Sequence, residues 1–319
     1  MKPNPIRTST PITRRSLLKG AAALAAASAL VGRRALAADA APAATKGRIK
    51  HSIVKWCFET AGSKWDIEQM CEVAKQLGCV GVELTSVSDY AVLKRHGLTC
   101  AIAQIDMNPA PPFLYGFNNP ANWPRVIKAT TEAIDAAAVA GVPSVICFTG
   151  YSALDPKEPK GGHLSLEQGA KNCVEGFKKV IDHAERKEIN LCLEMLNSRE
   201  DTHPMKGHPG YQGDHTDYCI DIIKRVGSPR MKLLLDIYHV QVQDGDIIRR
   251  IRQFHPYIGH VHTAGNPGRG ELDNKQEINF PPIMEALVAV GYKGYVGHEF
   301  IPTRDALQGL REAVTLCDV

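Results

Sequence analysis

Four side chains that can bind a metal recur in the second half of the chain, each near the end of a short apolar run. Glu194 lies in "LCLEM", Asp236 in "LLLDIY", His262 in "GHVHTA" and Glu299 in "VGHEF". A buried carboxylate is costly unless it is paired or bound to a metal. Three carboxylates held close together would also repel one another, and a divalent cation removes most of that repulsion. These residues therefore predict a metal site if the fold brings them together.

The ligand types narrow the choice of metal. Three carboxylates and one imidazole leave open positions on an octahedral ion, which suits Mn²⁺, Mg²⁺ or Co²⁺, while the histidine also admits Zn²⁺. A closed structural zinc site would rather contain cysteines. Taken singly, each residue could be a rim charge or a satisfied core histidine. Their conjunction favours one divalent cofactor ion at a catalytic site.

The elements that must position these residues follow a repeating pattern. After residue 48, a short apolar or β-branched run followed by a segment of helical periodicity recurs eight times. The expected strands cover residues 49–58, 79–85, 98–106, 142–150, 189–196, 231–238, 258–264 and 294–300. This alternation predicts an α/β fold, a single-domain (β/α)8 TIM barrel. Because the carboxyl ends of barrel strands open onto one face, strands five to eight would bring the four residues together.

The competing architecture is a doubly wound open sheet, which also alternates strands and helices. A dinucleotide-binding sheet would normally show a Gly-x-Gly-x-x-Gly turn after an early strand. The glycines of "AGNPGRGE" have another order and follow the seventh expected strand. We therefore interpret them as a flexible loop beside the site.

The N-terminus has the layout of an export signal. Arg14 and Arg15 precede a run of small apolar residues, 20–31, that is too short to span a bilayer, and "ALA" follows it. We predict a twin-arginine-type signal peptide over 1–37, a disordered leader over 38–48 and the barrel over 49–319. The protein would then be exported to the periplasm and meet the membrane only transiently. An uncleaved amphipathic anchor is the alternative.

Composition limits the classes of partner. The net charge of +4 is small and lies partly in the signal, so it gives no reason to expect nucleic acid. Nine cysteines, an odd number without a Cys-x-x-Cys pair, suit buried thiols rather than a disulfide framework. A twin-arginine route carries proteins that have already folded, which agrees with this pattern. Homo-oligomerisation stays open.

Three stretches carry a resemblance to a known family. "DIYHVQVQDGD", "GHVHTAGNPGRGELD" and "GHEF" resemble the hydroxypyruvate isomerase branch of the xylose isomerase-like sugar isomerase and epimerase superfamily, and the likeness covers the whole expected barrel. The resemblance implies one divalent metal on Glu194, Asp236, His262 and Glu299. It also implies that Glu194 and Glu299 are catalytic: one removes a proton beside a carbonyl, and the other returns it across the enediolate.

The same resemblance implies residues that contact the substrate. His239, in the Asp-x-x-His pattern, and Arg269, in "PGRGE", match the family's substrate-contacting positions. The alternatives are a loop histidine that caps the next helix and a solvated loop charge. Glu83, in "GVEL", could bind substrate or only brace the barrel mouth. His260, on the side of His262, is expected beside it as a supporting partner.

Other stretches would complete the mouth of the barrel. Trp56 and Phe58, expected on the first strand, could wall the pocket, although strand aromatics are more often core residues. The loop after Glu194, residues 197–215, holds three histidines and is expected to lie over the mouth.

We therefore expect an isomerase of a small hydroxy-carbonyl compound, and hydroxypyruvate to tartronate semialdehyde is the first choice. A ketose 3-epimerase is an alternative, since His262 stands where the hydroxypyruvate isomerase branch is expected to have Gln. A metal-dependent lyase and a non-catalytic sugar-binding barrel also remain. A zinc phosphodiesterase of the endonuclease IV kind would need more ligand histidines and a basic groove.

Overall fold

Eight parallel strands form a sheet in the order β3-β2-β1-β8-β7-β6-β5-β4. The strands are β1 (Lys50–Val54), β2 (Gly81–Glu83), β3 (Thr99–Cys100), β4 (Ser144–Cys147), β5 (Asn190–Glu194), β6 (Met231–Asp236), β7 (Ile258–Thr263) and β8 (Tyr295–His298). A bridge from Ala103 to Val145 joins the two ends, because Ala103 N donates to Ser144 O at 2.8 Å and Ile146 N donates to Ala103 O at 3.0 Å. The sheet therefore closes, and the expected (β/α)8 barrel is confirmed.

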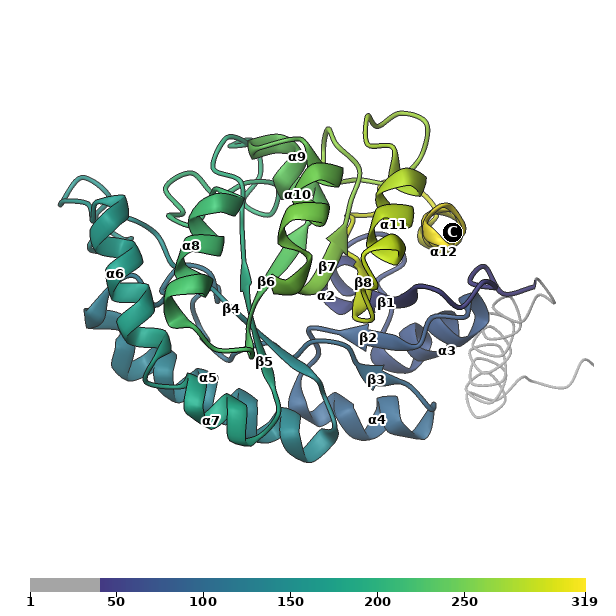
Figure 1. Cartoon of the computed structure of the whole chain (residues 1–319). Coiled ribbons are helices and arrows are strands. Elements are labelled where there is room, and N and C mark those ends of the chain that lie inside the picture. The colour runs from purple at the N-terminus through teal and green to yellow at the C-terminus, as the bar shows by residue number, and fades with distance from the viewer. Residues whose placement is uncertain (1–40) are drawn as a thin grey trace, which may run out of the picture. The chain divides into compact units, whose positions relative to one another are not determined.

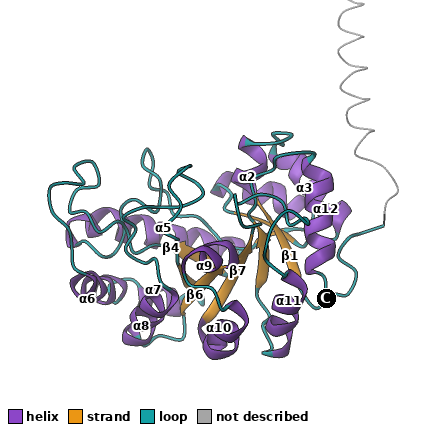
Figure 2. Ribbon diagram, turned by 90° about the horizontal axis from the view of Figure 1, so that it is seen from above, coloured by secondary structure: helices purple, strands orange, loops and turns teal. Residues whose placement is uncertain are grey.

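Helices surround this sheet, as the side view and the view from above show (Figure 1, Figure 2). They are α2 (Lys55–Thr60), α3 (Ile67–Leu77), α4 (Tyr90–Arg95), α5 (Trp123–Ala140), α6 (Leu166–Phe177), α7 (Ile181–Arg186), α8 (Thr216–Val226), α9 (Ile237–Gln243), α10 (Ile247–Phe254), α11 (Phe280–Ala289) and α12 (Ala306–Cys317). Single 3-10 turns lie at η1 (Val87–Asp89), η2 (Pro120–Asn122) and η3 (His255–Tyr257). The core lies between the helices and the strands and inside the barrel.

Helix α3 shows how local sequence sets these elements. The Asp66 carboxylate accepts a hydrogen bond from Gln69 N at 2.8 Å, and Gln69 Oε1 accepts one from Asp66 N at 3.0 Å. This capping box satisfies backbone donors that the first helical turn leaves unpaired. The helix ends at Gly78, whose φ of 79° is left-handed and favours glycine. Its apolar face is buried, which docks the helix on the barrel.

The structure is a computed structural model that describes residues 41–319, so the predicted signal peptide over 1–37 lies outside the described residues. The leader expected to be disordered contacts the barrel where it is described. Ala43 N and Ala44 N both donate to Leu77 O, while Thr45 N and Lys46 N donate to the Asp318 carboxylate at 2.7 and 2.9 Å. These backbone hydrogen bonds hold the end of the leader against the end of α3 and against the C-terminus.

All eight strands are shorter than the expected ranges, and the first and third show why. The first, expected over 49–58, ends at Val54, and Trp56 and Phe58 lie on helix α2 instead. Apolar residues on both sides of the chain suit either element, and here the chain turns over the barrel mouth, where Phe58 stacks on Trp65. The third, expected over 98–106, is reduced to β3, because the chain bends after Cys100 and pairs again only at Ala103.

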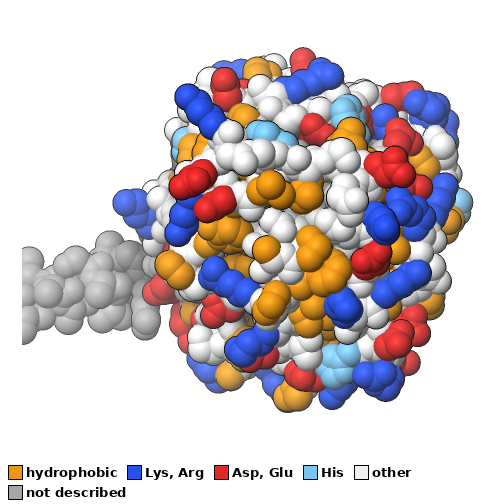
Figure 3. Space-filling view, turned by 90° about the vertical axis from the view of Figure 1, so that its left-hand side faces the viewer, with side chains coloured by type: hydrophobic (Ala, Val, Ile, Leu, Met, Phe, Trp, Pro, Cys, Tyr) orange, Lys and Arg blue, Asp and Glu red, His pale blue; other side chains and the backbone are white. Residues whose placement is uncertain are grey.

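The surface mixes charges of both signs. On the face seen in Figure 3, basic and acidic side chains are interspersed around a central group of hydrophobic side chains. Within residues 41–319, no helix has the length and apolar character that crossing a membrane would require.

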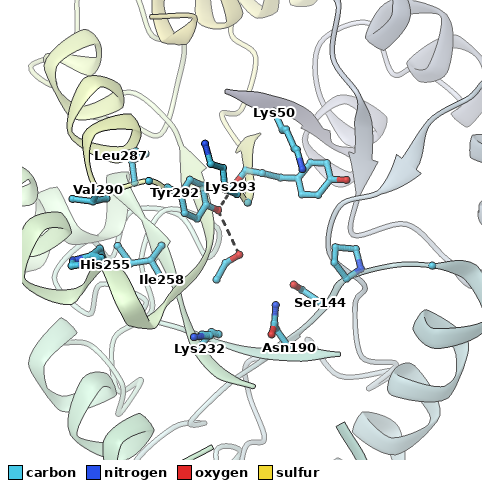
Figure 4. Close-up of a pocket in the computed structure, with 16 residues that line it drawn as sticks. Lys50, Ser144, Asn190, Lys232, His255, Ile258, Leu287, Val290, Tyr292 and Lys293 are labelled. Atoms are coloured by element: carbon cyan, nitrogen blue, oxygen red, sulfur yellow. Dashed lines mark hydrogen bonds between the residues drawn. The ribbon is translucent and has the colours of Figure 1, made fainter. Parts of the chain in front are cut away.

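A cavity of about 540 Å³ opens at the amino-terminal ends of the strands. Figure 4 shows Ser144, Asn190 and Tyr292 facing this opening. Lys50, Lys232 and Lys293 also line it. The basic side chains of this cavity therefore lie at the opposite end of the barrel from the carboxyl ends of the strands.

Candidate active site

The four residues predicted as metal ligands converge at the carboxyl ends of four neighbouring strands. Glu194 ends β5, Asp236 ends β6, His262 lies one residue before the end of β7, and Glu299 directly follows β8. One ligand atom from each of the four lies within 4.8 Å of the others, and all four side chains are buried. The barrel strands thus place them as the sequence pattern predicted.

Hydrogen bonds and ion pairs inside this group leave some atoms without a partner. His262 Nδ1 lies 2.8 Å from Glu299 Oε2 and 3.5 Å from Glu194 Oε1. Neither contact has hydrogen-bonding geometry, so His262 Nδ1 and Glu194 Oε1 remain buried and unsatisfied. Buried polar atoms are rarely left unpaired in folded proteins. Because His262 Nδ1 and Glu194 Oε1 lie close together without a hydrogen bond, we infer that a further group belongs between them.

The charged side chains of this group lie close together, and this proximity shifts their pKa values. Burial, with added repulsion from Glu299 and Glu194, raises the pKa of Asp236 to about 7. Burial and Glu299 also raise the pKa of Glu194. Burial alone would raise the pKa of Glu299 too, but the positive charges of Arg269 and His262 hold it well below its usual range.

His262 responds in the opposite sense. Burial opposes the charge of its ring, but Glu299, Glu194 and Glu83 outweigh burial and raise its pKa well above the ordinary value. Without a metal, bound protons and the positive charge of the His262 ring therefore offset the negative charge of the carboxylates. A divalent cation would replace those protons and keep the carboxylates ionised.

These residues fit a single divalent cation. Carboxylate oxygens and one imidazole nitrogen face a common point, and two of those atoms are buried without a hydrogen-bond partner. Oxygen-rich ligand sets of this kind suit Mn²⁺, Mg²⁺ or Co²⁺, and one histidine also permits Zn²⁺. The donor set therefore agrees with the cofactor expected from the sequence.

Glu83 supports this group from within the barrel. Its Oε1 lies 2.7 Å from His262 Nε2 and 3.0 Å from His260 Nε2, while Oε2 accepts a hydrogen bond from Ser52. Although burial disfavours its charge, the two histidines lower the pKa of Glu83 to about 2. Glu83 does not line the mouth cavity. Of the two roles considered, its contacts support bracing rather than substrate binding. His260 lies beside His262 as expected, with ring centroids 5.0 Å apart.

His239 lies on helix α9, directly after β6, and is fully buried. The Asn197 backbone N–H donates to its Nδ1 at 3.1 Å, and the Asn197 side-chain Nδ2 lies 2.6 Å from the same atom. An acceptor Nδ1 places the ring proton on Nε2, which lies 3.6 Å from Asp236 Oδ2 and has no hydrogen-bond partner. Burial and the charge of Arg269 lower the pKa of His239, so its ring is neutral.

Arg269 lies in the loop after β7 and reaches into the same group. Its Nη2 lies 2.6 Å from Glu299 Oε2 and 3.2 Å from Asp236 Oδ2, while Nη1 donates to Met205 O. The guanidinium also lies over the rings of Trp56 and Tyr238, at 5.4 and 5.7 Å from their centroids. It is 2% exposed, so it is not a solvated loop charge.

A cavity of about 560 Å³ opens above the ligand group at the barrel mouth. Glu194 and Glu299 line it, whereas Asp236 and His262 do not. The rest of the lining is mostly apolar and comes from the loops after the strands; it comprises Trp56, Thr60, Ala61, Leu84, Gln104, Pro111, Pro112, Phe113, Ile146, Phe148, Leu196, His203, Met205, His208, Arg269 and Ile301. Two of the proposed ligands are therefore reachable from the mouth.

Part of the lining of this cavity was predicted from the sequence. Trp56 lines it as considered, and the loop 197–215 contributes His203 and His208, while His215 bonds Asp244 instead. Asn197 and Phe113 were missed. Asn197 lies three residues after Glu194, a spacing like that of His239 after Asp236, which is the signal that could have drawn attention to it.

Comparison with known proteins matches two parts of the chain. A model described as the xylose isomerase-like TIM barrel matches residues 71–317. A model of the TAT (twin-arginine translocation) pathway signal sequence matches residues 11–31, within the predicted signal peptide, which supports export by the twin-arginine route.

Two relatives and one solved structure show the range of similarity. A putative hydroxypyruvate isomerase from Homo sapiens is 42% identical over 102 residues, which cover 32% of this chain and only 37% of that protein, less than two thirds of its length. Hydroxypyruvate isomerase from Escherichia coli strain K12 is 27% identical over 255 residues, covering 78% and 93%. A structure described as AP endonuclease, family 2, from Brucella melitensis has a TM-score of 0.69 at 24% identity, covering 82% and 97%; this likeness concerns the fold.

Proposed function

The chain belongs to the xylose isomerase-like TIM barrel family, and from this premise we propose that it is a metal-dependent isomerase of a hydroxy-carbonyl compound. One divalent cation would be held by Glu194, Asp236, His262 and Glu299. The reaction moves a proton between two carbons through an enediolate. The names of its relatives make hydroxypyruvate, converted to tartronate semialdehyde, the first compound to test.

One observation carries this proposal. Among the four candidate ligands, Glu194 and Glu299 are the two that also line the mouth cavity, and they come from β5 and from the end of β8. A substrate in the cavity would therefore meet two carboxylates from different sides of the barrel. Two such bases are what proton abstraction and return require.

The environments of the two glutamates differ in a way that suits this pair. Trp56 Nε1 donates to Glu299 Oε1 at 3.0 Å, and Arg269 binds Oε2, so Glu299 is held as the charged form. Glu194 has a raised pKa and an unsatisfied Oε1. These pKa values belong to the metal-free protein, and a bound cation would keep both carboxylates ionised. Glu299 is the more tightly held of the pair and Glu194 the less constrained one.

A C–H group beside a carbonyl is only weakly acidic, so the enediolate formed from it must be stabilised. A divalent cation bound here would supply that stabilisation by attracting the negative charge on the substrate oxygens. His239 does not line the mouth cavity, but its neutral ring leaves Nε2–H unpaired 3.6 Å from Asp236 Oδ2, so it would donate to a substrate oxygen only where the substrate reaches the cation. Arg269 keeps Glu299 oriented through the hydrogen bond to Oε2.

The proposal includes the periplasm as the place of action. The signal match supports export, and the nine cysteines, all of which are free and buried, suit a protein that folds before it crosses the membrane. A cation loaded during folding would travel with the protein.

The test is solvent deuterium incorporation into hydroxypyruvate and related hydroxy-carbonyl compounds by the metal-loaded protein. We expect Glu194→Gln and Glu299→Gln each to lower the exchange rate by at least about 10²-fold, within the range for loss of a positioned acid or base. Glu285→Gln, exposed on α11, is the matched control and should keep the wild-type rate. Wild-type exchange in either active-site variant would refute the proposal.

Epimerisation remains the second candidate because it uses the same pair of bases. The strand-seven ligand, His262, is the observation that favours it, as argued from the sequence. Product analysis by NMR separates the two: an isomerase moves the carbonyl group, whereas a 3-epimerase only inverts a carbon. Binding of a sugar without any exchange would instead indicate a non-catalytic barrel, and cleavage products would indicate a lyase.

A further inference from the structure

The mouth cavity has a polar floor and largely apolar walls. Glu194, Glu299 and Arg269 form the floor, and the walls are mostly aromatic, aliphatic and proline side chains. We infer that the substrate carries an uncharged apolar group, of the size of an aromatic ring, attached to its hydroxy-carbonyl end. This inference rests on the proposed function, because it names the substrate class for the same site.

The size of the cavity supports a substrate larger than hydroxypyruvate. Its volume of about 560 Å³ lies within the range of pockets that enclose drug-sized ligands, roughly 300–1,000 Å³. A three-carbon keto acid would occupy only the floor beside the two glutamates. The remaining space would then hold water against apolar walls, which is unfavourable compared with an apolar group.

The far wall is aromatic and comes from three different loops. Phe113, in the segment between β3 and α5, packs on His208 with ring centroids 4.4 Å apart. Phe113 also meets Phe148, just after β4, edge to face at 6.3 Å. Met205 and Leu196 also line the cavity. Offset and edge-to-face contacts of this kind favour a further flat ring.

The cavity offers no free cation for a phosphate. Arg269 is the one lysine or arginine among the described residues that line it, and its guanidinium already binds Asp236, Glu299 and Met205 O. Burial, with Arg269 nearby, lowers the pKa of His208 to about 3, so its ring is neutral. Lys50, Lys232 and Lys293 line the other cavity, at the amino-terminal ends of the strands (Figure 4). A phosphorylated tail would therefore lose its hydration for few partners, since only Arg269 Nε and His208 Nδ1 are buried, unpaired nitrogens of the described lining.

Polar partners for a second sugar ring are also scarce. Of the polar wall residues, the Thr60 hydroxyl donates to Trp56 O at 2.7 Å, Gln104 and His203 are exposed, and His208 offers one unpaired ring nitrogen, Nδ1. A ring with several hydroxyl groups would bury some of them without hydrogen bonds, which costs free energy. An aromatic or alkyl group meets no such cost, so the walls favour it over a sugar.

Binding of unreactive compounds tests the inference without the reaction. Calorimetry on the metal-loaded protein would compare 4-phenylbutane-1,2-diol with butane-1,2,4-triol, which differ in a phenyl against a hydroxyl group at the tail. We expect the phenyl compound to bind at least tenfold more tightly, as burial of an aromatic ring predicts. In Phe113→Ser this advantage should fall below threefold, while Val139→Ser, 90% exposed on α5, should retain it. Equal affinity for the two compounds, or an advantage unchanged in Phe113→Ser, would overturn the inference.

The kinetics of deuterium exchange test whether the apolar tail also favours the reaction. The compounds are dihydroxyacetone, its phosphate and 1-hydroxy-4-phenylbutan-2-one, which share a hydroxymethyl ketone and differ in the tail. We expect the phenyl ketone to have the highest kcat/KM for deuterium uptake, by at least tenfold, and a higher kcat/KM for the phosphate would refute the inference. If neither these compounds nor hydroxypyruvate exchange, the proposed function fails, and the binding comparison still decides whether the tail is apolar.

Discussion

Glu83 and His262 are joined by a buried hydrogen bond of 2.7 Å between Oε1 and Nε2. Because the pKa of Glu83 is lowered to about 2, this carboxylate is ionised and can only accept, so His262 Nε2 carries the proton. The other ring nitrogen, Nδ1, therefore turns to Glu194 and Glu299. The Glu83 carboxylate, inside the barrel, thus sets the orientation of His262, the predicted metal ligand.

The Glu83→Gln substitution tests this arrangement. It keeps the shape of the side chain but removes the charge that orients and strengthens His262. We expect the affinity for Co²⁺ or Mn²⁺ to fall by about 10- to 100-fold, the usual cost of losing such a partner. Competition with a chelating dye measures it, and Glu285→Gln serves as the surface control. An affinity equal to that of the wild type would contradict the role given to Glu83.

Removing the cation should lower the stability of the barrel. A ligand that binds only the folded state stabilises it by about 2.7 kcal/mol at a hundred times its Kd. We expect Mn²⁺ added to chelator-treated protein to raise Tm by a few degrees. Asp236→Asn should lose this rise but still fold, because an Asn oxygen can accept from Tyr238 N and His239 N as Asp236 Oδ1 does. A full rise of Tm in Asp236→Asn would exclude this residue as a ligand.

Arg269→Lys should impair the site although it conserves charge. The guanidinium uses two nitrogens at once, Nη1 towards Met205 O and Nη2 towards Glu299 and Asp236, which a single ammonium group cannot reproduce. We expect kcat/KM for exchange to fall about tenfold or more, as for loss of a strong charge-assisted hydrogen bond.

The pH dependence of kcat/KM provides a second measurement on Arg269→Lys. Arg269 is the largest of the influences that lower the pKa of Glu299 against the effect of burial. A weaker contact lets that pKa rise, so the acidic limb of kcat/KM should move to higher pH. Arg249→Lys, at an exposed position on α10, is the control. An acidic limb that stays in place would show that Arg269 does not hold Glu299 ionised.

The parts of the fold that repeat could be predicted from the sequence. Eight apolar runs alternating with helical segments admit few architectures, and barrel geometry then brings Glu194, Asp236, His262 and Glu299 to one point. This convergence follows from strand order alone and does not depend on the loops.

Residues on irregular segments could not be found in that way. Phe113 lies in a loop without periodicity, so its contact with His208 depends on how two loops pack together. Trp56 was expected on a strand, because the short helix α2 has no cap or stop signal in its sequence. The role of Glu83 was left open for a related reason, since its partners come from β1 and β7, far away along the chain.

The last prediction concerns acid stability and a histidine outside the site. His51 on β1 is 1% exposed; its Nδ1 lies 3.2 Å from His298 Nε2, and its Nε2 lies 3.8 Å from the Asp318 carboxylate. Burial lowers the pKa of His51 to about 4, although Asp318 opposes that shift. In the unfolded chain the pKa returns to about 6.5.

The sign of the effect follows from these two values. Between about pH 6.5 and about pH 4 the unfolded chain binds a proton on His51 that the folded protein does not bind, so stability falls as the pH falls. From about pH 7 to about pH 5 this one group contributes a loss of about 2 kcal/mol. In His51→Gln that contribution disappears. Urea unfolding of the chelator-treated protein at the two pH values should therefore show a smaller loss than in the wild type. His255→Gln, at an exposed histidine, should leave the loss unchanged. An equal loss in His51→Gln and in the wild type would mean that His51 is not held neutral by the fold.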